Sequence, residues 1–273
     1  MSRAESETPP TRRHPGDWGA VVVPTYNEAE NIERLVTQIL ALGLNLQVIV
    51  VDDGSPDGTG QIVDRLAASD GHVQCVHRPG KMGLGTAYIA GFKQALSQGA
   101  PFVMSMDADF SHDPSYVPAM VQMSGSRDLV IGSRYVQGGG TRDCTVPRKF
   151  LSRAANMFAK VILGLKAQDC TAGFRCYRRH VLEAIELDTI FSSGYSFLIE
   201  MIYRCQKKGF SVGEVPIIFA NRQRGASKIS RTEILKAMYT VLRLRFTHLP
   251  WDSMVAFYHR RQARGIGTRG ASK

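Results

Sequence analysis

Asp107 and Asp109 stand two residues apart, directly after the apolar run of residues 101–104, and are the side chains of this sequence best suited to chemistry. In extended backbone, residues i and i+2 point to the same side. The two carboxylates can therefore converge on one divalent cation at a strand end. Ligation by oxygen alone suits Mg²⁺ or Mn²⁺, which can hold a diphosphate. The alternative is a solvated turn before a helix that starts at Asp113-Pro114, but the acidic loop at an earlier strand end favours the metal.

Two earlier segments carry residues that suit a nucleotide. In residues 24–28, Pro24 ends a strand, the Tyr26 ring can stack on a base, and Asn27 or Glu28 can form hydrogen bonds. The alternative is a loop that starts a helix and is capped by Asn27. In residues 52–59, two acids precede a tight turn, and a carboxylate there can accept hydrogen bonds from a base or a ribose. A capped turn is the alternative for this segment too.

Apolar strand patterns alternate with helical patterns along the first half of the chain. The expected strands are 21–23, 48–51, 72–77, 101–106 and 128–132, and the expected helices are 29–40, 57–68, 86–97 and 114–123. This alternation indicates an α/β fold with a doubly wound, mostly parallel sheet. Ligands of such sheets bind beyond the carboxyl ends of the strands, where the motifs above also lie.

The second half is less regular. After a loop at 138–140, we expect helices at 148–163 and 196–207 and strands at 174–177 and 211–218. Residues 230–246 predict a C-terminal amphipathic helix, whose apolar stripe is Ile234, Leu235, Met238, Val241 and Leu242. Such a helix either lies in a membrane interface or packs on the domain core.

Composition narrows the class of protein. The chain has 273 residues, and 44% of them are hydrophobic. No apolar run approaches the roughly 18 residues that span a bilayer. Residues 1–17 are polar and lack the apolar middle of a secretory signal, so we expect a disordered leader on a cytoplasmic protein. Five scattered cysteines without Cys-x-x-Cys spacing argue against a disulfide framework and a structural zinc site.

Positive charge is concentrated at the C-terminus. From residue 229 onward, nine Lys or Arg face two acids, which places +7 of the net +10 in the last 45 residues. Nucleic acid and an anionic membrane both attract such a tail. The charge lies outside the α/β region, and neither an RNA-stacking sheet nor a recognition-helix pattern is present, so we expect no nucleic-acid partner.

Six motifs occur in an order that resembles one family. They are residues 24–28 (PTYNE), 51–59 (VDDGSPDGT), 83–88 (GLGTAY), 107–109 (DAD), 132–135 (GSRY) and 221–228 (NRQRGASK). Together they resemble the dolichol- or polyprenol-phosphate mannosyltransferases, which belong to the GT-A glycosyltransferases of family 2. The resemblance implies a GT-A catalytic domain over 18–228. The apolar stripe and the charge described above then give an amphipathic helix over 229–249, either interfacial or packed on the core, and a basic tail over 250–273.

The resemblance also implies roles for individual residues. The guanine and ribose pocket would be lined by Pro24, Tyr26, Glu28, Val51 and Asp53. Asp107, Ala108 and Asp109 would bind the sugar nucleotide, with Asp107 and Asp109 holding Mg²⁺ or Mn²⁺. Ser111 stands where some relatives have a metal-binding Gln. Arg134, Arg148, Arg222 and Lys228 match positions that contact phosphates, and residues 169–175 resemble a loop that precedes the acceptor site. Asp109, Arg134 and Arg148 are the expected catalytic residues.

The implied reaction is inverting transfer of mannose from GDP-mannose to polyprenyl phosphate. The acceptor phosphate is already ionised, so no deprotonating base is needed, unlike in transfer to a sugar hydroxyl. A polyprenyl-phosphate glucosyltransferase using a UDP-sugar is the nearest alternative. We expect peripheral association with the cytoplasmic face of a membrane, through the C-terminal helix or a separate membrane-anchoring protein.

Overall fold

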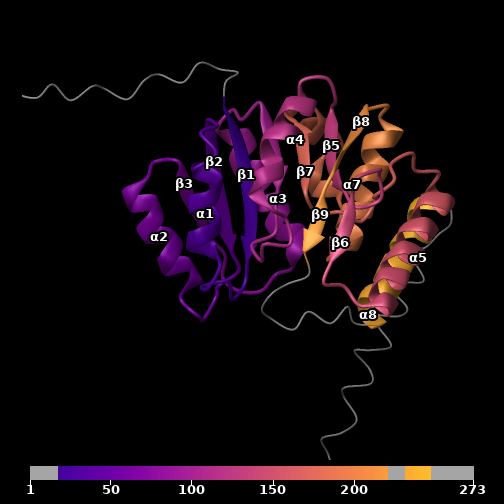
Figure 1. Cartoon of the computed structure of the whole chain (residues 1–273), viewed down its shortest axis with the longest axis horizontal. Helices are drawn as coiled ribbons and strands as arrows, with labels where there is room; N and C mark the ends of the chain where they lie inside the picture. Colours follow the sequence, from indigo (N-terminus) through magenta and orange to yellow (C-terminus); the bar gives the residue numbers. More distant parts are fainter. Residues whose placement is uncertain (1–17, 221–230, 247–273) are drawn as a thin grey trace, which may run out of the picture.

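The computed structural model describes residues 18–220 and 231–246, and its centre is a seven-stranded sheet (Figure 1). The strand order is β3-β2-β1-β4-β7-β5-β8. The bounds are β1 (Gly19–Thr25), β2 (Leu46–Asp52), β3 (Val73–His77), β4 (Phe102–Ser105), β5 (Leu129–Ser133), β7 (Arg175–Arg178) and β8 (Val212–Pro216). All neighbours are parallel except β7, which is antiparallel to β4 and β5. The doubly wound, mostly parallel sheet expected from the alternating pattern is confirmed.

Helices cover both faces of this sheet, because the side chains of a strand alternate between its two faces. Val21 and Val23 of β1 belong to one buried cluster and Val22 to the other. The bounds of the helices are α1 (Ile32–Leu40), α2 (Thr59–Ser69), α3 (Leu84–Ser97), α4 (Val117–Ser124), α5 (Val146–Leu163), α6 (Arg179–Ile185), α7 (Ser196–Lys207) and α8 (Arg231–Arg245). Helices α1, α2 and α4 contribute to the cluster of Val21 and Val23. Helices α3 and α5 to α8 contribute to that of Val22.

Helix α3 lies unusually close to β1. A Cβ atom added at Gly91 would stand 2.2 Å from Cγ1 of Val22, far inside a normal contact distance. Only glycine allows this approach without moving a strand. The close packing fixes the position of α3, which carries Tyr88 toward the carboxyl edge of the sheet.

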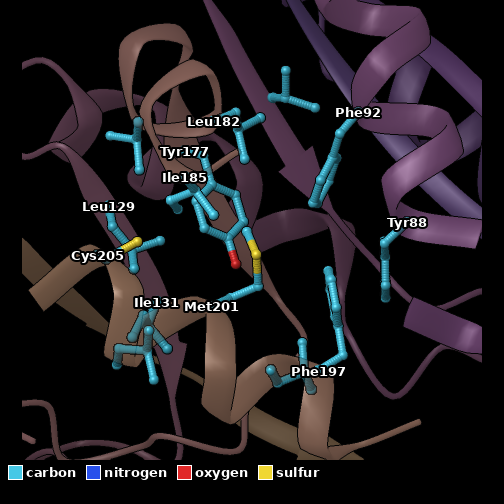
Figure 2. Close-up of a cluster of buried hydrophobic side chains, with 14 of the residues drawn as sticks. Tyr88, Phe92, Leu129, Ile131, Tyr177, Leu182, Ile185, Phe197, Met201 and Cys205 are labelled. Carbon is cyan, nitrogen blue, oxygen red and sulfur yellow. The ribbon is translucent and has the colours of Figure 1, made fainter. Parts of the chain in front are cut away.

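Aromatic side chains join α3 to α7 and β7 beneath that edge (Figure 2). The Tyr88 ring stacks on Phe197 with centroids 6.0 Å apart, and Phe92 meets Tyr177 edge-on at 5.6 Å. All four rings are fully buried. Such pairs contribute about 0.5–1.5 kcal/mol each beyond the burial of their surface, so the cluster holds α3 rigidly relative to α7.

The structure differs from the expected elements in the second half of the chain. The strand expected over 211–218 ends at Pro216, which has no N–H to continue the ladder. The chain then forms a separate strand, β9 (Ile218–Ala220), which pairs in parallel with β6 (Gly140–Arg142). Gly140, expected in a loop, therefore begins a strand. Helix α6 was also not expected, because seven residues are too few for a clear periodicity.

Helix α8 confirms the predicted C-terminal helix and packs against α5 and α7. Val241 and Leu244 are buried, and the Tyr203 hydroxyl of α7 donates to the Leu244 carbonyl at 3.1 Å. Packing on the core is thus the correct alternative for this part of the helix, whereas Leu235 and Met238 stay exposed. Figure 1 shows α5 and α8 side by side at one end of the molecule. None of the helices within the described ranges has the length and apolar character needed to cross a bilayer.

Candidate active site

The Asp107–Asp109 motif lies in a bend beyond β4. The strand ends at Ser105, so the two acids do not stand on extended backbone as the spacing suggested. Both acids nevertheless line one pocket of about 70 Å³. Ser111 and His112 line the same pocket. The two acids thus share a pocket, brought there by a turn and not by a pleat, and their convergence on one cation stays a prediction.

Asp107 is held from two directions. The Tyr88 hydroxyl donates to its Oδ1 at 2.7 Å, and its backbone N–H donates to Nδ1 of His112 at 3.0 Å. Burial, followed by the charge of Asp107, raises the pKa of Tyr88 well above its usual value, so the hydroxyl remains a donor. Because an N–H can only donate, Nδ1 of His112 is the acceptor and its ring proton lies on Nε2. The His112 ring also stacks on Phe174 at 5.1 Å.

Asp109 and Ser111 form a tight turn. The Ser111 N–H donates to Oδ1 of Asp109 at 3.0 Å, and Phe110 between them adopts a left-handed φ of 60°. The Ser111 Oγ is buried and has no hydrogen-bond partner among the described residues. An unpaired buried hydroxyl costs about 1–3 kcal/mol. The orphaned hydroxyl and two carboxylates form an all-oxygen donor set, which fits a hard divalent cation such as Mg²⁺ or Mn²⁺.

Asp53, expected to meet a base or ribose, shapes the neighbouring loop. Its Oδ2 accepts the N–H groups of Met82 and Gly83 at 3.0 and 3.3 Å. Its Oδ1 lies 3.1 Å from Nη1 of Arg78, and both side chains are almost fully buried. The two atoms of this ion pair do not form a hydrogen bond with each other. Oδ1 is thus buried without a hydrogen-bond partner among the described residues.

The residues expected around the base differ in their exposure and in their contacts. Tyr26 is exposed and has the Lys81 Nζ 4.4 Å above its ring. Glu28 accepts a bond from the Asn31 amide at 2.8 Å, and Pro24 is half-buried on β1. Helix α1 is preceded by Asn31, so capping by Asn27 is wrong.

Two expected side chains are buried in the core. Val51 packs beneath α3, and Ala108 lies in the opposite core cluster. Any contact of Val51 or Ala108 with a nucleotide is therefore limited to their backbone atoms, and the expected roles of both residues stay predictions.

Arg134 is clamped by Asp169. Its Nε and Nη2 donate to the two carboxylate oxygens at 2.7 and 2.8 Å, and Nη2 also donates to Thr171 Oγ1 at 2.7 Å. Burial alone would raise the pKa of Asp169, but the bonds and charge of Arg134 outweigh it and the pKa is lowered. In the same way the pKa of Arg134 is raised, despite the opposing effect of burial. The partner of Arg134 was not foreseen, because 35 residues separate the pair.

Arg148 lies in the first turn of α5 and lines the pocket of Asp107 and Asp109. This helix has no acidic residue in its first turn and no side-chain cap. Its partial positive end and Arg148 thus both favour an anion. Arg222 and Lys228, the two further phosphate contacts expected from the sequence, lie outside the described residues.

A second and larger cavity adjoins this pocket. Its volume is about 350 Å³, and most of its lining surface is apolar. The residues shared with the small pocket are Arg134, Arg148, Thr171, Tyr195 and Phe219. Beyond them it runs between α5 and α8, past Phe158, Met238 and Val241. The apolar cavity was not predicted, since no local pattern reveals a gap between two helices.

The sheet order, the acid pair beyond β4 and the flanking nucleotide-type loops define a GT-A glycosyltransferase fold. The sequence model of glycosyl transferase family 2 matches residues 20–186, and the chain belongs to that family. The resemblance expected from the six motifs is thereby confirmed.

Two curated relatives and one solved structure illustrate this membership. The chain is 44% identical over 237 residues to polyprenol monophosphomannose synthase of Mycolicibacterium smegmatis, covering 86% of this chain and 89% of the relative. It is 42% identical over 222 residues to undecaprenyl-phosphate mannosyltransferase of Micrococcus luteus, covering 81% and 91%. The fold is similar to that of a mannosyltransferase from Pyrobaculum calidifontis solved with GDP-Man and Mn²⁺. That similarity has a TM-score of 0.53, 17% identity and coverage of 94% and 78%.

Proposed function

We propose that this protein transfers mannose from GDP-mannose to polyprenyl phosphate, with inversion at the anomeric carbon, at a membrane surface. The observation that carries the proposal is the junction of two unlike cavities. A small pocket lined by two carboxylates meets a larger, mostly apolar cavity, and Arg134 and Arg148 line both. The carboxylates of the first suit the metal and diphosphate of a sugar nucleotide, and the second suits an isoprenoid chain, so the lipid phosphate would lie at the arginines between them.

The size and lining of the apolar cavity agree with this role. At about 350 Å³ it lies at the lower end of the range for small-ligand sites. It would therefore hold only the part of a long isoprenoid nearest the phosphate. The remaining chain would stay in the lipid phase, so the reaction would take place at a membrane surface.

The charges at the junction suit the joining of two anionic substrates. Asp107, Asp109 and Ser111 would hold Mg²⁺ or Mn²⁺, which when bound offsets the charge of the donor diphosphate as it leaves. Arg148 would bind the acceptor phosphate. Arg134 would face the same phosphate with the part of its guanidinium that does not bond to Asp169 or Thr171. Both arginines thus reduce the repulsion between acceptor and donor.

A phosphate acceptor is already ionised and needs no deprotonating base. Among the described residues that line the small pocket, Asp107 and Asp109 are the only carboxylates. His112 accepts the Asp107 N–H at Nδ1. A sugar hydroxyl acceptor would require such a base. This favours a phosphate acceptor and a single, inverting displacement.

The choice of mannose rests on the relatives. Both are named for transfer of mannose to a polyprenyl phosphate, and each covers more than four fifths of this chain. GDP as the nucleotide has weaker support, namely a distant structure of the same fold bound to GDP-Man. Donor identity is therefore what the experiment below must test.

Helix α5 supports attachment to a membrane. Val146, Phe150, Met157 and Val161 follow one another at spacings of four, seven and four residues and are 79%, 75%, 58% and 67% exposed. Residues at these spacings share one face of a helix. Lys149, Arg153 and Lys160 follow the same spacing beside this α5 stripe. An apolar face flanked by cations is typical of a helix lying in the interface of an anionic membrane, so α5 and the exposed part of α8 would together seat the mouth of the apolar cavity on the lipid. The protein would then be peripheral on the cytoplasmic face, with or without a separate anchoring protein.

The test is transfer of radiolabelled sugar to a short polyprenyl phosphate in detergent, with the full chain and Mg²⁺ or Mn²⁺. GDP-mannose and UDP-glucose serve as alternative donors. Asp109→Ala removes an expected metal ligand, and Asp188→Asn is the control, because Asp188 is exposed and pairs with Lys93 far from the pocket. We expect a β-linked mannolipid from GDP-mannose with the wild type and Asp188→Asn. With Asp109→Ala we expect a loss of about 100-fold or more, as for other preorganised charge-stabilising groups.

Each other outcome has a definite meaning. Glucolipid from UDP-glucose alone would retain the acceptor site and overturn the donor. Equal activity of Asp109→Ala would overturn the role of the acid pair. Absence of lipid product from either donor, with folded protein in native lipid vesicles, would contradict the proposed function.

A further inference from the structure

A cluster of three side chains outside the active site has the composition of a transition-metal site. Asp64 on α2 and Cys75 and His77 on β3 each bring one potential ligand atom within 4.8 Å of the others. Within residues 18–220 and 231–246 this is the one group of three or more His, Cys, Asp or Glu so arranged. We infer that Asp64, Cys75 and His77 bind a thiophilic divalent cation such as Zn²⁺ at the edge of the sheet.

The backbone positions these ligands without help from a metal. Cys75 and His77 are two residues apart on β3 and thus face the same side of the sheet. Strand β3 pairs only with β2, so this side chain row lies at the sheet edge. Asp64 projects from α2, which packs against β3. Its Oδ1 lies 2.8 Å from Nε2 of His77, and Cys75 Sγ lies 3.9 Å from Nδ1 of the same ring.

The thiol distinguishes this cluster from ordinary histidine–carboxylate pairs. His180 and Asp128 approach to 2.9 Å, as do His72 and Asp70, and the three-residue cluster is found at neither. An N, S and O donor set suits Zn²⁺, whereas Mg²⁺ prefers oxygen alone. The site therefore differs in preference from the Asp107 and Asp109 pair, and it would leave a fourth coordination position open.

Electrostatics at the cluster also favour a cation. The negative charges of Asp64 and Asp52 both act on the Cys75 thiol. A bound cation would compensate these charges and stabilise the thiolate. Ligands of a tetrahedral zinc lie about 3.5 Å apart, which follows from bonds of about 2.0–2.3 Å. Asp64 and His77 are each 54% exposed, so they can rotate to close the remaining gap.

The site would brace the nucleotide side of the active site without taking part in transfer. His77 is followed directly by Arg78, which pairs with Asp53 at 3.1 Å. Asp53 in turn accepts the N–H groups of Met82 and Gly83 at the start of α3. A cation that ties α2 to β3 would therefore stabilise the strand end from which Arg78 reaches this loop.

The test uses Co²⁺ as a spectroscopic probe on the full, reduced chain, with excess Mg²⁺ to occupy the oxygen site. We expect one equivalent of Co²⁺ to give a thiolate-to-cobalt charge-transfer band that Zn²⁺ abolishes. Cys75→Ser should remove the band, and His77→Ala should weaken binding by about tenfold or more. The matched controls Cys144→Ser and His180→Ala should bind as the wild type does. Zn²⁺ should also raise the midpoint of thermal unfolding of the wild type, and it should leave the midpoint of Cys75→Ser unchanged.

A wild-type protein without the band would overturn the inference, and so would an equal band in Cys75→Ser. Equal weakening by His77→Ala and His180→Ala would also overturn it, because this would indicate adventitious binding to surface histidines. None of these readouts depends on glycosyl transfer, so the result is independent of the proposed function.

Discussion

The hydroxyl of Tyr88, buried on α3, donates to Oδ1 of Asp107 at 2.7 Å. This contact joins the hydrophobic core to the expected metal ligand. Tyr88 stacks between Phe92 and Phe197, and Gly91 holds its helix against β1. The position of one carboxylate oxygen is thus set by the packing of several core elements, which leaves it little freedom to move.

Tyr88→Phe should therefore lower metal affinity more than stability. The ring and its stacking remain, but Asp107 loses the donor that orients it. Loss of such a supporting bond typically costs 10- to 100-fold in metal affinity or activity, whereas the hydrogen bond contributes about 0.5–1.5 kcal/mol to the free energy of unfolding. The measurement is transfer rate against Mn²⁺ concentration, with urea unfolding in parallel. Tyr203→Phe, which removes a hydroxyl bond between α7 and α8, is the control, and an unchanged Mn²⁺ dependence in Tyr88→Phe would contradict the positioning role.

Ser111→Ala should change stability and metal affinity in opposite directions. The Ser111 hydroxyl has no partner among the described residues, so its removal should stabilise the metal-free protein by about 1 kcal/mol. The same change should weaken Mn²⁺ binding by about tenfold. Titration followed by the Mn²⁺ EPR signal and urea unfolding measure the two effects. Ser124→Ala is the matched control, because that buried hydroxyl donates to the Val121 carbonyl at 2.7 Å and its loss should destabilise the protein. A hydroxyl that does not meet the metal would leave Mn²⁺ affinity unchanged.

Asp169→Asn should destabilise the protein strongly at neutral pH, because it leaves the Arg134 cation without its buried partner. Breaking such a pair costs about 3–5 kcal/mol in the free energy of unfolding. The folded-state pKa of Asp169 lies below its ordinary 3.8. The stability that ionised Asp169 contributes is therefore complete above the ordinary pKa of 3.8 and is lost as pH falls through the lower, folded-state pKa. The difference between wild type and variant should stay constant from about pH 7 to about pH 5 and shrink at lower pH.

Urea unfolding across this pH range measures the effect of Asp169, and the exposed Asp188→Asn serves as the control. A difference that grew as pH fell would contradict the lowered pKa of Asp169. A difference near zero at neutral pH would mean that the pair with Arg134 contributes no net stability.

Removing two apolar side chains of the α5 stripe should weaken binding to anionic vesicles. A buried Phe or Met contributes about 1.5–3 kcal/mol, so the double variant Phe150→Ser, Met157→Ser should bind about tenfold more weakly or worse. Co-sedimentation with vesicles containing anionic lipid measures this. Met82→Ser is the matched control, since Met82 is 57% exposed and Met157 58%, but Met82 lies in the loop between β3 and α3. Equal vesicle binding by the double variant would show that α5 does not contact lipid.

Much of the fold could be predicted because its signals are local. The buried strands of β1, β2 and β4 read as continuous apolar runs, and the acids and glycines that follow them mark the carboxyl ends where ligands bind. Asp107 and Asp109 were found in this way, and the apolar stripe of residues 230–246 predicted helix α8. The extra strands β6 and β9 were missed because three residues contain too little pattern to distinguish a strand from a loop.

What local pattern could not decide are the contacts between residues far apart in the chain. Asp169 meets Arg134 across 35 residues and Tyr88 meets Asp107 across 19. The apolar cavity arises between α5 and α8, whose facing residues are more distant still. Spacing along the chain specifies which face of an element a side chain occupies, but only the packing of whole elements specifies which side chains from different elements meet, and where a gap is left between them.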